Sequence, residues 1–78
     1  MTKKQDQVDM QEFVAKAGSV EVARVMLGLS GSAVYAYCNG RRDVPLSVKV
    51  TLNLFGCVTK TKFNELKEAA ELTLALAA

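Results

Sequence analysis

The sequence contains no histidine and no tryptophan, and its 78 residues include only one proline and two cysteines. Histidine is the most frequent general base and metal ligand at neutral pH. Cys38 and Cys57 stand too far apart in the chain for the paired-cysteine motif of a zinc site. We therefore expect no enzymatic activity, no cofactor and no metal. The two thiols are expected to be small buried side chains without a function of their own.

The chain also lacks a long apolar run. A helix needs about 20 consecutive apolar residues to span a bilayer, and no segment of the sequence approaches that length. The first nine residues are polar and unlike a signal peptide. We expect one soluble, cytoplasmic domain over residues 1–78 with no membrane partner. A domain of this size buries only roughly 60 % of the surface of its unfolded chain, so a second copy or a ligand would add stability.

Positive charge is concentrated in the middle of the chain. Residues 22–62 hold a single acidic residue, Asp43, whereas the segments before and after them are slightly acidic, so a net charge of +2 conceals a basic centre. The basic residues of this segment are Arg24, Arg41, Arg42, Lys49, Lys60 and Lys62. A local excess of this kind is typical of a phosphate-binding surface. The alternative is a scatter of solvated side chains.

Apolar residues recur at helical spacing, and no segment alternates as a strand would. We expect an all-α fold, a compact bundle of about five short helices. Ser19 and Ser30 are expected to cap the second and third helices, and a glycine is expected to end each of the first four. The expected helices cover residues 9–17, 20–27 and 30–39, then Pro45 to Phe55, and a last segment from about Lys62 toward the C-terminus.

The spacing of apolar residues also indicates which sides of these helices are buried. Val34 and Tyr37 lie three residues apart and would face the core, which turns Tyr35 outward because successive residues are about 100° apart. In the fourth helix Val48, Leu52 and Phe55 form one apolar stripe, and we expect Val44, Val50 and Leu54 to lie near it. In the fifth, Phe63, Leu66, Ala70 and Thr73 share one side.

Three stretches of this pattern resemble a known family. "LGLSGSAV" matches a glycine corner between two helices, "YCNGRRDVP" the exit from a recognition helix, and "GCVTKTKFNEL" the segment after the fourth helix. Together they resemble the helix-turn-helix domains of Cro and λ-repressor type, including the small Cro-like and YdaS-like regulators of phages and prophages. The resemblance covers about residues 22–66 and implies a λ-repressor-like fold with a motif core of Ala23, Leu27, Leu29, Val34 and Tyr37.

Two positions depart from the family pattern. The family usually has a small residue four positions before the corner glycine, where this chain has Arg24, with Ala23 one position earlier. Either the second helix carries an extra residue or Arg24 turns out of the helix crossing. The family also often has a glutamine where Gly31 stands, and a glycine cannot read a base.

The resemblance places Ser30, Gly31, Ser32, Tyr35, Ala36 and Asn39 on the face presented to the major groove. The Asn39 amide has the geometry for a paired contact to adenine, and a serine hydroxyl can donate to a phosphate or a base. The expected DNA contacts are Ser30, Ser32, Tyr35, Ala36, Asn39, Arg41 and Arg42, with Lys49, Lys60 and Lys62 as peripheral phosphate partners. The alternatives are that Ser30 is only a helix cap and that Asn39, beside Gly40, only ends its helix.

The C-terminal stretch "ELTLALAA" has no charged side chain after Glu71. A helix that is apolar on nearly all sides favours a subunit contact, so we expect a homodimer in which residues 62–78 form the dimerisation helix through Leu72, Leu74 and Leu76. The alternative is that this helix packs only over its own core.

These expectations combine into one functional hypothesis. The sequence predicts a sequence-specific regulator of transcription, a Cro-like repressor that binds a palindromic operator in double-stranded DNA as a dimer and acts by promoter occlusion, in the cytoplasm of a bacterial host cell. The alternative is a small helical adaptor on the same scaffold, such as a phage inhibitor of a host regulator or an antitoxin-like partner, which the sparse reading face favours.

Overall fold

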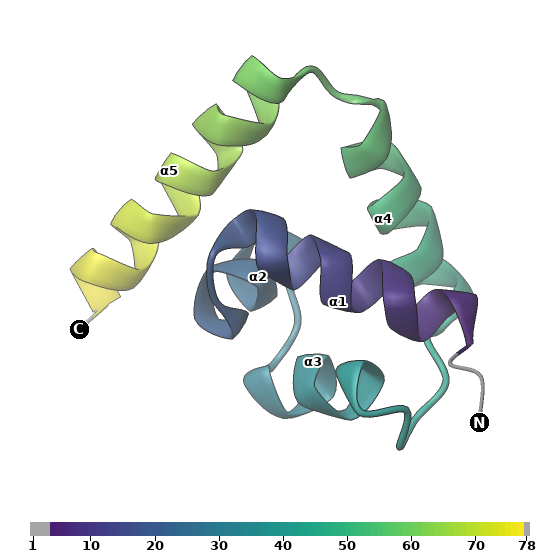
Figure 1. The fold of residues 1–78 in the computed structure, drawn as a ribbon. Helices are drawn as coiled ribbons and strands as arrows, with labels where there is room; N and C mark the ends of the chain where they lie inside the picture. Colours follow the sequence, from purple (N-terminus) through teal and green to yellow (C-terminus); the bar gives the residue numbers. More distant parts are fainter. Residues whose placement is uncertain (1–3, 78) are drawn as a thin grey trace.

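The computed structural model describes residues 4–77, and this part of the chain contains helices but no strand. The predicted all-α fold class is confirmed (Figure 1). None of the helices in the described part is both long and apolar enough to cross a membrane. The helices are α1 (Gln5–Ala17), α2 (Val20–Leu27), α3 (Gly31–Cys38), α4 (Leu46–Cys57) and α5 (Lys60–Ala77).

The first three helices form the body of the molecule, and α4 and α5 flank it as two diverging arms (Figure 1). Helix α2 packs against α5 on one side and against α1 and α3 on the other, while α1 also contacts α3 and α4. The turn that joins α4 to α5 lies at the opposite end of the molecule from α3 (Figure 1). Any residue on that turn is therefore remote from α3.

The core consists of two clusters of buried side chains. One joins α1, α3 and the start of α4 through Met10, Ala33, Val34, Tyr37, Val44 and Val48. The other joins α1, α2 and α5 through Phe13, Ala17, Val22, Ala23 and Ala70. Burying these side chains removes apolar surface from water, which is the main favourable term in folding.

Three phenylalanine rings tie α1 to both arms. The ring centroid of Phe13 lies 5.1 Å from that of Phe55 and 5.8 Å from that of Phe63, and the latter two are 6.1 Å apart. All three pairs meet edge to face, the arrangement that the ring quadrupoles favour. Phe55 and Phe63 lie near the turn between α4 and α5, so this cluster fixes the place where the arms diverge.

Several helix boundaries differ from those that the sequence predicts. Helix α1 begins at Gln5 rather than Asp9, and α5 begins at Lys60 rather than Lys62. The earlier start of α5 has a local cause, because the Thr59 hydroxyl oxygen accepts from the Lys62 backbone N–H at 3.1 Å.

The fourth helix also differs from the prediction. Pro45 precedes α4 as its N-cap residue, with extended backbone at ψ 157°, and does not belong to the first turn. Gly56 was predicted to end this helix but lies inside it, and α4 continues to Cys57. Gly56 does not have the positive φ with which a glycine ends a helix, whereas Gly18, Gly28 and Gly40 do.

Candidate nucleic-acid interface

The corner between α2 and α3 has the local geometry that the sequence predicts. Gly28 ends α2 in the left-handed conformation at φ 70°, and the Leu29 N–H donates to the Arg24 carbonyl at 2.9 Å. Ser30 caps α3, its hydroxyl oxygen accepting from the Ala33 N–H at 3.2 Å. These local bonds set the direction in which α3 leaves the corner.

The helix crossing beside the corner is filled by Ala23, which is fully buried. Arg24 turns toward its own helix and places its Nε 2.9 Å from Glu21 Oε2. Of the two alternatives left open by the sequence, Arg24 therefore takes the one in which it leaves the crossing. Gly31 lies against the same pair, since a Cβ at this position would be 3.6 Å from Glu21 Oε1 and 3.7 Å from Arg24 Cδ.

Helix α3 has a buried side and an exposed side. Val34 and Tyr37 are buried in the core, as predicted. Ser32, Tyr35 and Asn39 are exposed, and the Tyr35 side of the helix is open to solvent with 57 % of that residue accessible. Their spacing of three and four residues places them on one side of the helix. Ala36, which was predicted on the same face, is only half-buried, and its carbonyl accepts from the Arg41 and Arg42 N–H groups.

The sequence left two roles open for each of Ser30 and Asn39, and the structure decides part of this question. Ser30 does cap α3, and it is also exposed, so a contact with DNA stays a prediction. Asn39 has a right-handed backbone at φ −88°, whereas Gly40 takes the left-handed conformation at φ 74°. Gly40 alone therefore supplies the unusual conformation at the end of α3.

Arg41 and Arg42 follow α3 directly and are exposed. Within residues 4–77 neither forms an ion pair with a carboxylate. Arg42 Cζ lies 5.6 Å from the centroid of the Tyr37 ring, a cation–π contact that holds this charge close to α3. Two positive charges uncompensated by acids thus stand at the C-terminal end of the exposed helix.

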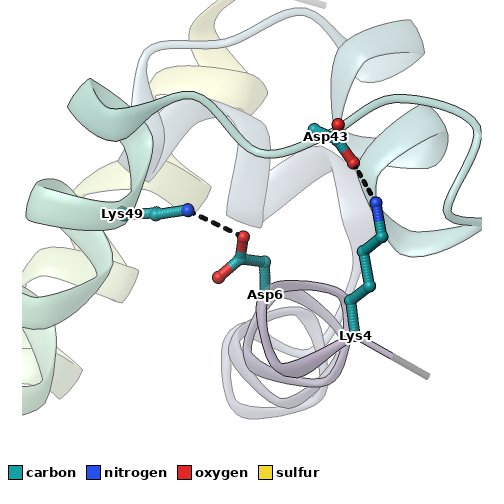
Figure 2. A network of polar contacts seen from close by, with 4 residues as sticks. All are labelled: Lys4, Asp6, Asp43 and Lys49. Carbon is teal, nitrogen blue, oxygen red and sulfur yellow. Dashed lines mark hydrogen bonds and ion pairs between the residues drawn. The ribbon is translucent and has the colours of Figure 1, made fainter. Parts of the chain in front are cut away.

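The neighbouring lysines are compensated (Figure 2). Lys4 Nζ lies 2.6 Å from Asp43 Oδ1, and Lys49 Nζ lies 2.9 Å from Asp6 Oδ2. The hydrogen bond from Lys4, together with its charge, lowers the pKa of Asp43, and the same contact raises the pKa of Lys4. Lys49 was predicted as a peripheral phosphate contact, but its charge is largely balanced by Asp6 in the free protein.

Lys60 and Lys62 are not brought to the same place as α3. They lie in the first turn of α5, at the far end of the molecule from α3 (Figure 1). Lys62 Nζ also lies 3.8 Å from Glu65 Oε2. The basic centre of the sequence is therefore divided in space, and of its members only Arg41 and Arg42 adjoin the end of α3.

Helix α1 supports the end of α3 through contacts that no sequence pattern predicted. The side-chain amides of Gln7 and Gln11 donate to the Cys38 carbonyl at 3.0 Å and 2.8 Å. Each bond joins residues that are far apart in the chain, so no local motif could have indicated it.

The two cysteines differ in exposure. The Cys38 side chain is partly buried, which raises the pKa of its thiol. Cys57, by contrast, is exposed, and the expectation that both thiols are buried is wrong for it.

The leucines predicted to form a dimer contact are divided between surface and core. Leu72 and Leu76 are exposed, whereas Leu74 packs against the cluster that contains Phe13 and Ala70. Thr73, predicted to share the buried side of this helix, is exposed. Part of the C-terminal helix thus covers its own core.

A groove of about 630 Å³ lies between α1, α4 and the start of α5. The three phenylalanines line it, together with Asp9, Glu12 and Lys16 from α1. It lies near the α4–α5 turn and contains none of the residues of the exposed face of α3. No group of three or more potential metal-ligating side chains occurs in the described residues.

Comparison with known proteins gives no relative for this chain. No protein-family model matches it, and neither a curated protein nor a solved structure does.

Proposed function

We propose that this protein is a sequence-specific DNA-binding regulator of transcription that inserts α3 into the major groove. The observation that carries the proposal is the combination of an exposed α3 face with two uncompensated arginines at its end. A helix fits the major groove of B-DNA, and arginines beside it contact the phosphate backbone. The resemblance of the corner to helix-turn-helix domains supports the same orientation.

The exposed side chains have complementary roles in this proposal. Asn39 can form a paired contact with adenine, and Ser32 can donate to a base or a phosphate. Tyr35 supplies an apolar ring and a hydroxyl, which suits a thymine methyl or a phosphate. Arg41 and Arg42 position the helix through phosphates and do not read sequence. Lys60 and Lys62 lie in the first turn of α5, and we expect them to lie outside the contact that α3 makes.

The proposed biological action is repression. A dimer that covers a palindromic operator occludes a promoter by occupying it, and the α3 helices of the two copies would contact the two half-sites. A second candidate is a helical adaptor that binds another protein on the same scaffold. It is favoured by the small number of exposed side chains on α3 that could read a base, Ser32, Tyr35 and Asn39.

A mobility-shift assay over a salt series tests the proposal. Binding through phosphates weakens steeply with salt because counterions are released, with a slope of about −0.9 per phosphate contact. Replacing Arg41 and Arg42 together by alanine should weaken binding to all DNA sequences and reduce the slope by about 2. The matched control is K60A/K62A, which removes the same charge at the far end of the molecule and should leave binding unchanged.

Specificity is tested by Asn39→Ala, which should relax base preference at one position of a selected site. DNA binding that is absent at low salt, or that does not respond to salt, would contradict the proposal and favour the adaptor. Equal losses in R41A/R42A and K60A/K62A would show that α3 is not the bound element.

A further inference from the structure

Helix α4 has an outward apolar face opposite its buried side. Leu46, Val50 and Leu54 are 75 %, 48 % and 63 % exposed. They are four residues apart, which places them along one side of the helix. Val48 on the other side is buried, and Leu52 packs against the core. Helix α4 is therefore apolar on two sides, of which the fold covers one.

This face carries no charge. The only charged residue of α4 is Lys49, and its ammonium group is turned to Asp6 of α1 (Figure 2). The other exposed residues of α4 are polar but uncharged, or small: Ser47, Asn53, Gly56 and Cys57. An exposed apolar face without charge marks an interaction surface, because interface centres are depleted of charged residues.

We propose that the outward face of α4 is a dimer interface, on which the same face of a second copy of this chain packs around a two-fold axis near Val50. An uncharged face offers a charged partner no complementary group, but it pairs with itself without repulsion. Pairing of α4 with α4 closes the assembly at two copies, whereas head-to-tail packing of α4 on the α5 leucines of the next copy closes only where the rotation between copies forms a ring.

The exposed leucines of α5 are less suited to self-pairing. Leu72 shares its side of the helix with Glu68, four residues earlier. Pairing through that side would bring the Glu68 carboxylates of both copies to one interface, and like charges there are unfavourable. Helix α4 has no acidic residue at all.

The size of the face sets the expected strength of the dimer. From Leu46 to Leu54 the helix rises about 12 Å. We expect one such helix from each copy to bury less than the roughly 1,200 Å² of the smallest stable interfaces. We therefore expect a dimer whose dissociation constant is micromolar or weaker, so that its population depends on protein concentration.

The consequence for DNA rests on the proposed function. Helix α4 begins shortly after Arg42, at the end of the molecule where α3 lies (Figure 1). Pairing through α4 would place the two α3 helices on either side of the two-fold axis, as a palindromic site requires. Two half-sites on one duplex would raise the effective concentration of the copies and favour the dimer.

Sedimentation equilibrium of the DNA-free protein tests the interface directly. The mean mass of the wild-type chain should rise with concentration from 8.4 kDa toward twice that value. Val50→Lys should remain monomeric at every concentration, with circular dichroism confirming that it is folded. The matched control, Leu76→Lys, makes a like change at an exposed apolar site of α5 and should dimerise as the wild type does.

A second measurement traps the pair covalently. In a chain with Cys57→Ser, the variant Val50→Cys should form a disulfide-linked dimer under mild oxidation, because residues near a two-fold axis face their own copies. Leu76→Cys in the same background should stay monomeric. A wild-type chain that is monomeric at millimolar concentration, or dimerisation abolished by Leu76→Lys and kept by Val50→Lys, would overturn the proposal.

The test separates this inference from the proposed DNA binding. Apolar association does not depend on counterion release, so the dimer should persist at salt concentrations that abolish phosphate contacts. A dimer without DNA binding would refute only the proposed function. DNA binding by a chain that never dimerises would refute only the α4 interface.

Discussion

At the scale of single residues, the glycines at the two ends of α3 differ in backbone conformation and in surroundings. Gly40 has φ 74°, and a Cβ there would meet the Gln7 side-chain oxygen at 3.0 Å. Gly31 has no such constraint, since its nearest neighbours would be at ordinary contact distance, 3.6 Å and 3.7 Å. The end of α3 thus requires glycine, whereas its beginning does not.

We predict opposite effects of alanine at these two positions. Gly40→Ala should lower the free energy of unfolding by about 1–2 kcal/mol, because a left-handed backbone is unfavourable with a side chain. Gly31→Ala should raise it by about 0.4–1 kcal/mol by restricting the unfolded chain. Urea unfolding measures the free energy of unfolding of both variants. A Gly40→Ala variant as stable as the wild type would contradict the left-handed conformation of Gly40.

At the scale of helices, α1 supports the element that we propose to bind DNA. The Gln7 and Gln11 amides donate to the last carbonyl of α3, and Lys4 and Asp6 form ion pairs with the following loop and α4 (Figure 2). The orientation of α3 relative to the body therefore depends on α1 as well as on the corner at Gly28.

The bond from Gln7 can be tested within one helix. Gln7→Ala should cost about 0.5–1.5 kcal/mol, the net contribution of one hydrogen bond, and should speed amide hydrogen exchange at the end of α3. The control is Gln5→Ala, whose amide donates to the exposed Asp9 carboxylate on the same helix at 2.8 Å. Equal exchange rates in both variants would show that Gln7 does not support α3.

The helices also show what a sequence can and cannot predict. The corner at Gly28 and Ser30 was predicted because its hydrogen bonds join residues close in the chain. Val50 and Leu54 were expected near the buried stripe and are exposed. This prediction was wrong because periodicity shows that a helix side is apolar but not whether a neighbouring helix covers it. The bracing by Gln7 joins residues 31 apart and has no local signal.

For the candidate site, too, the sequence predicted the local geometry but not the arrangement of distant residues. The outward direction of Tyr35 followed from the helical period once Val34 and Tyr37 were assigned to the core. The separation of Lys60 from Arg41 did not follow from the sequence. Charges counted along the chain give no information on the path of α4, which leads to the first turn of α5 at the far end of the molecule.

At the scale of the whole molecule, Phe13 connects α1 to both arms and is 5 % exposed. Phe13→Ala should destabilise the fold by about 3–5 kcal/mol, as large-to-small core substitutions do. Because domains of this kind are stable by only about 5–15 kcal/mol, we expect a marked fall in the thermal midpoint.

The contrasting variant is Tyr35→Ala on the exposed face of α3. It should change the stability by less than about 0.5 kcal/mol and still weaken DNA binding. Calorimetry and mobility shift on the two variants separate the fold from the interface. A Tyr35→Ala protein that unfolds as readily as Phe13→Ala would show that Tyr35 belongs to the core.

The contact between Lys4 and Asp43 has a practical consequence for anyone handling this protein. The described chain starts beside the loop that follows α3, whereas its last helix ends on another side of the molecule (Figure 1). A fluorophore attached to Lys4 would lie beside Asp43 and crowd the neighbouring arginines, and one attached near Ala77 would leave them accessible. Labelling experiments should therefore use the carboxyl end.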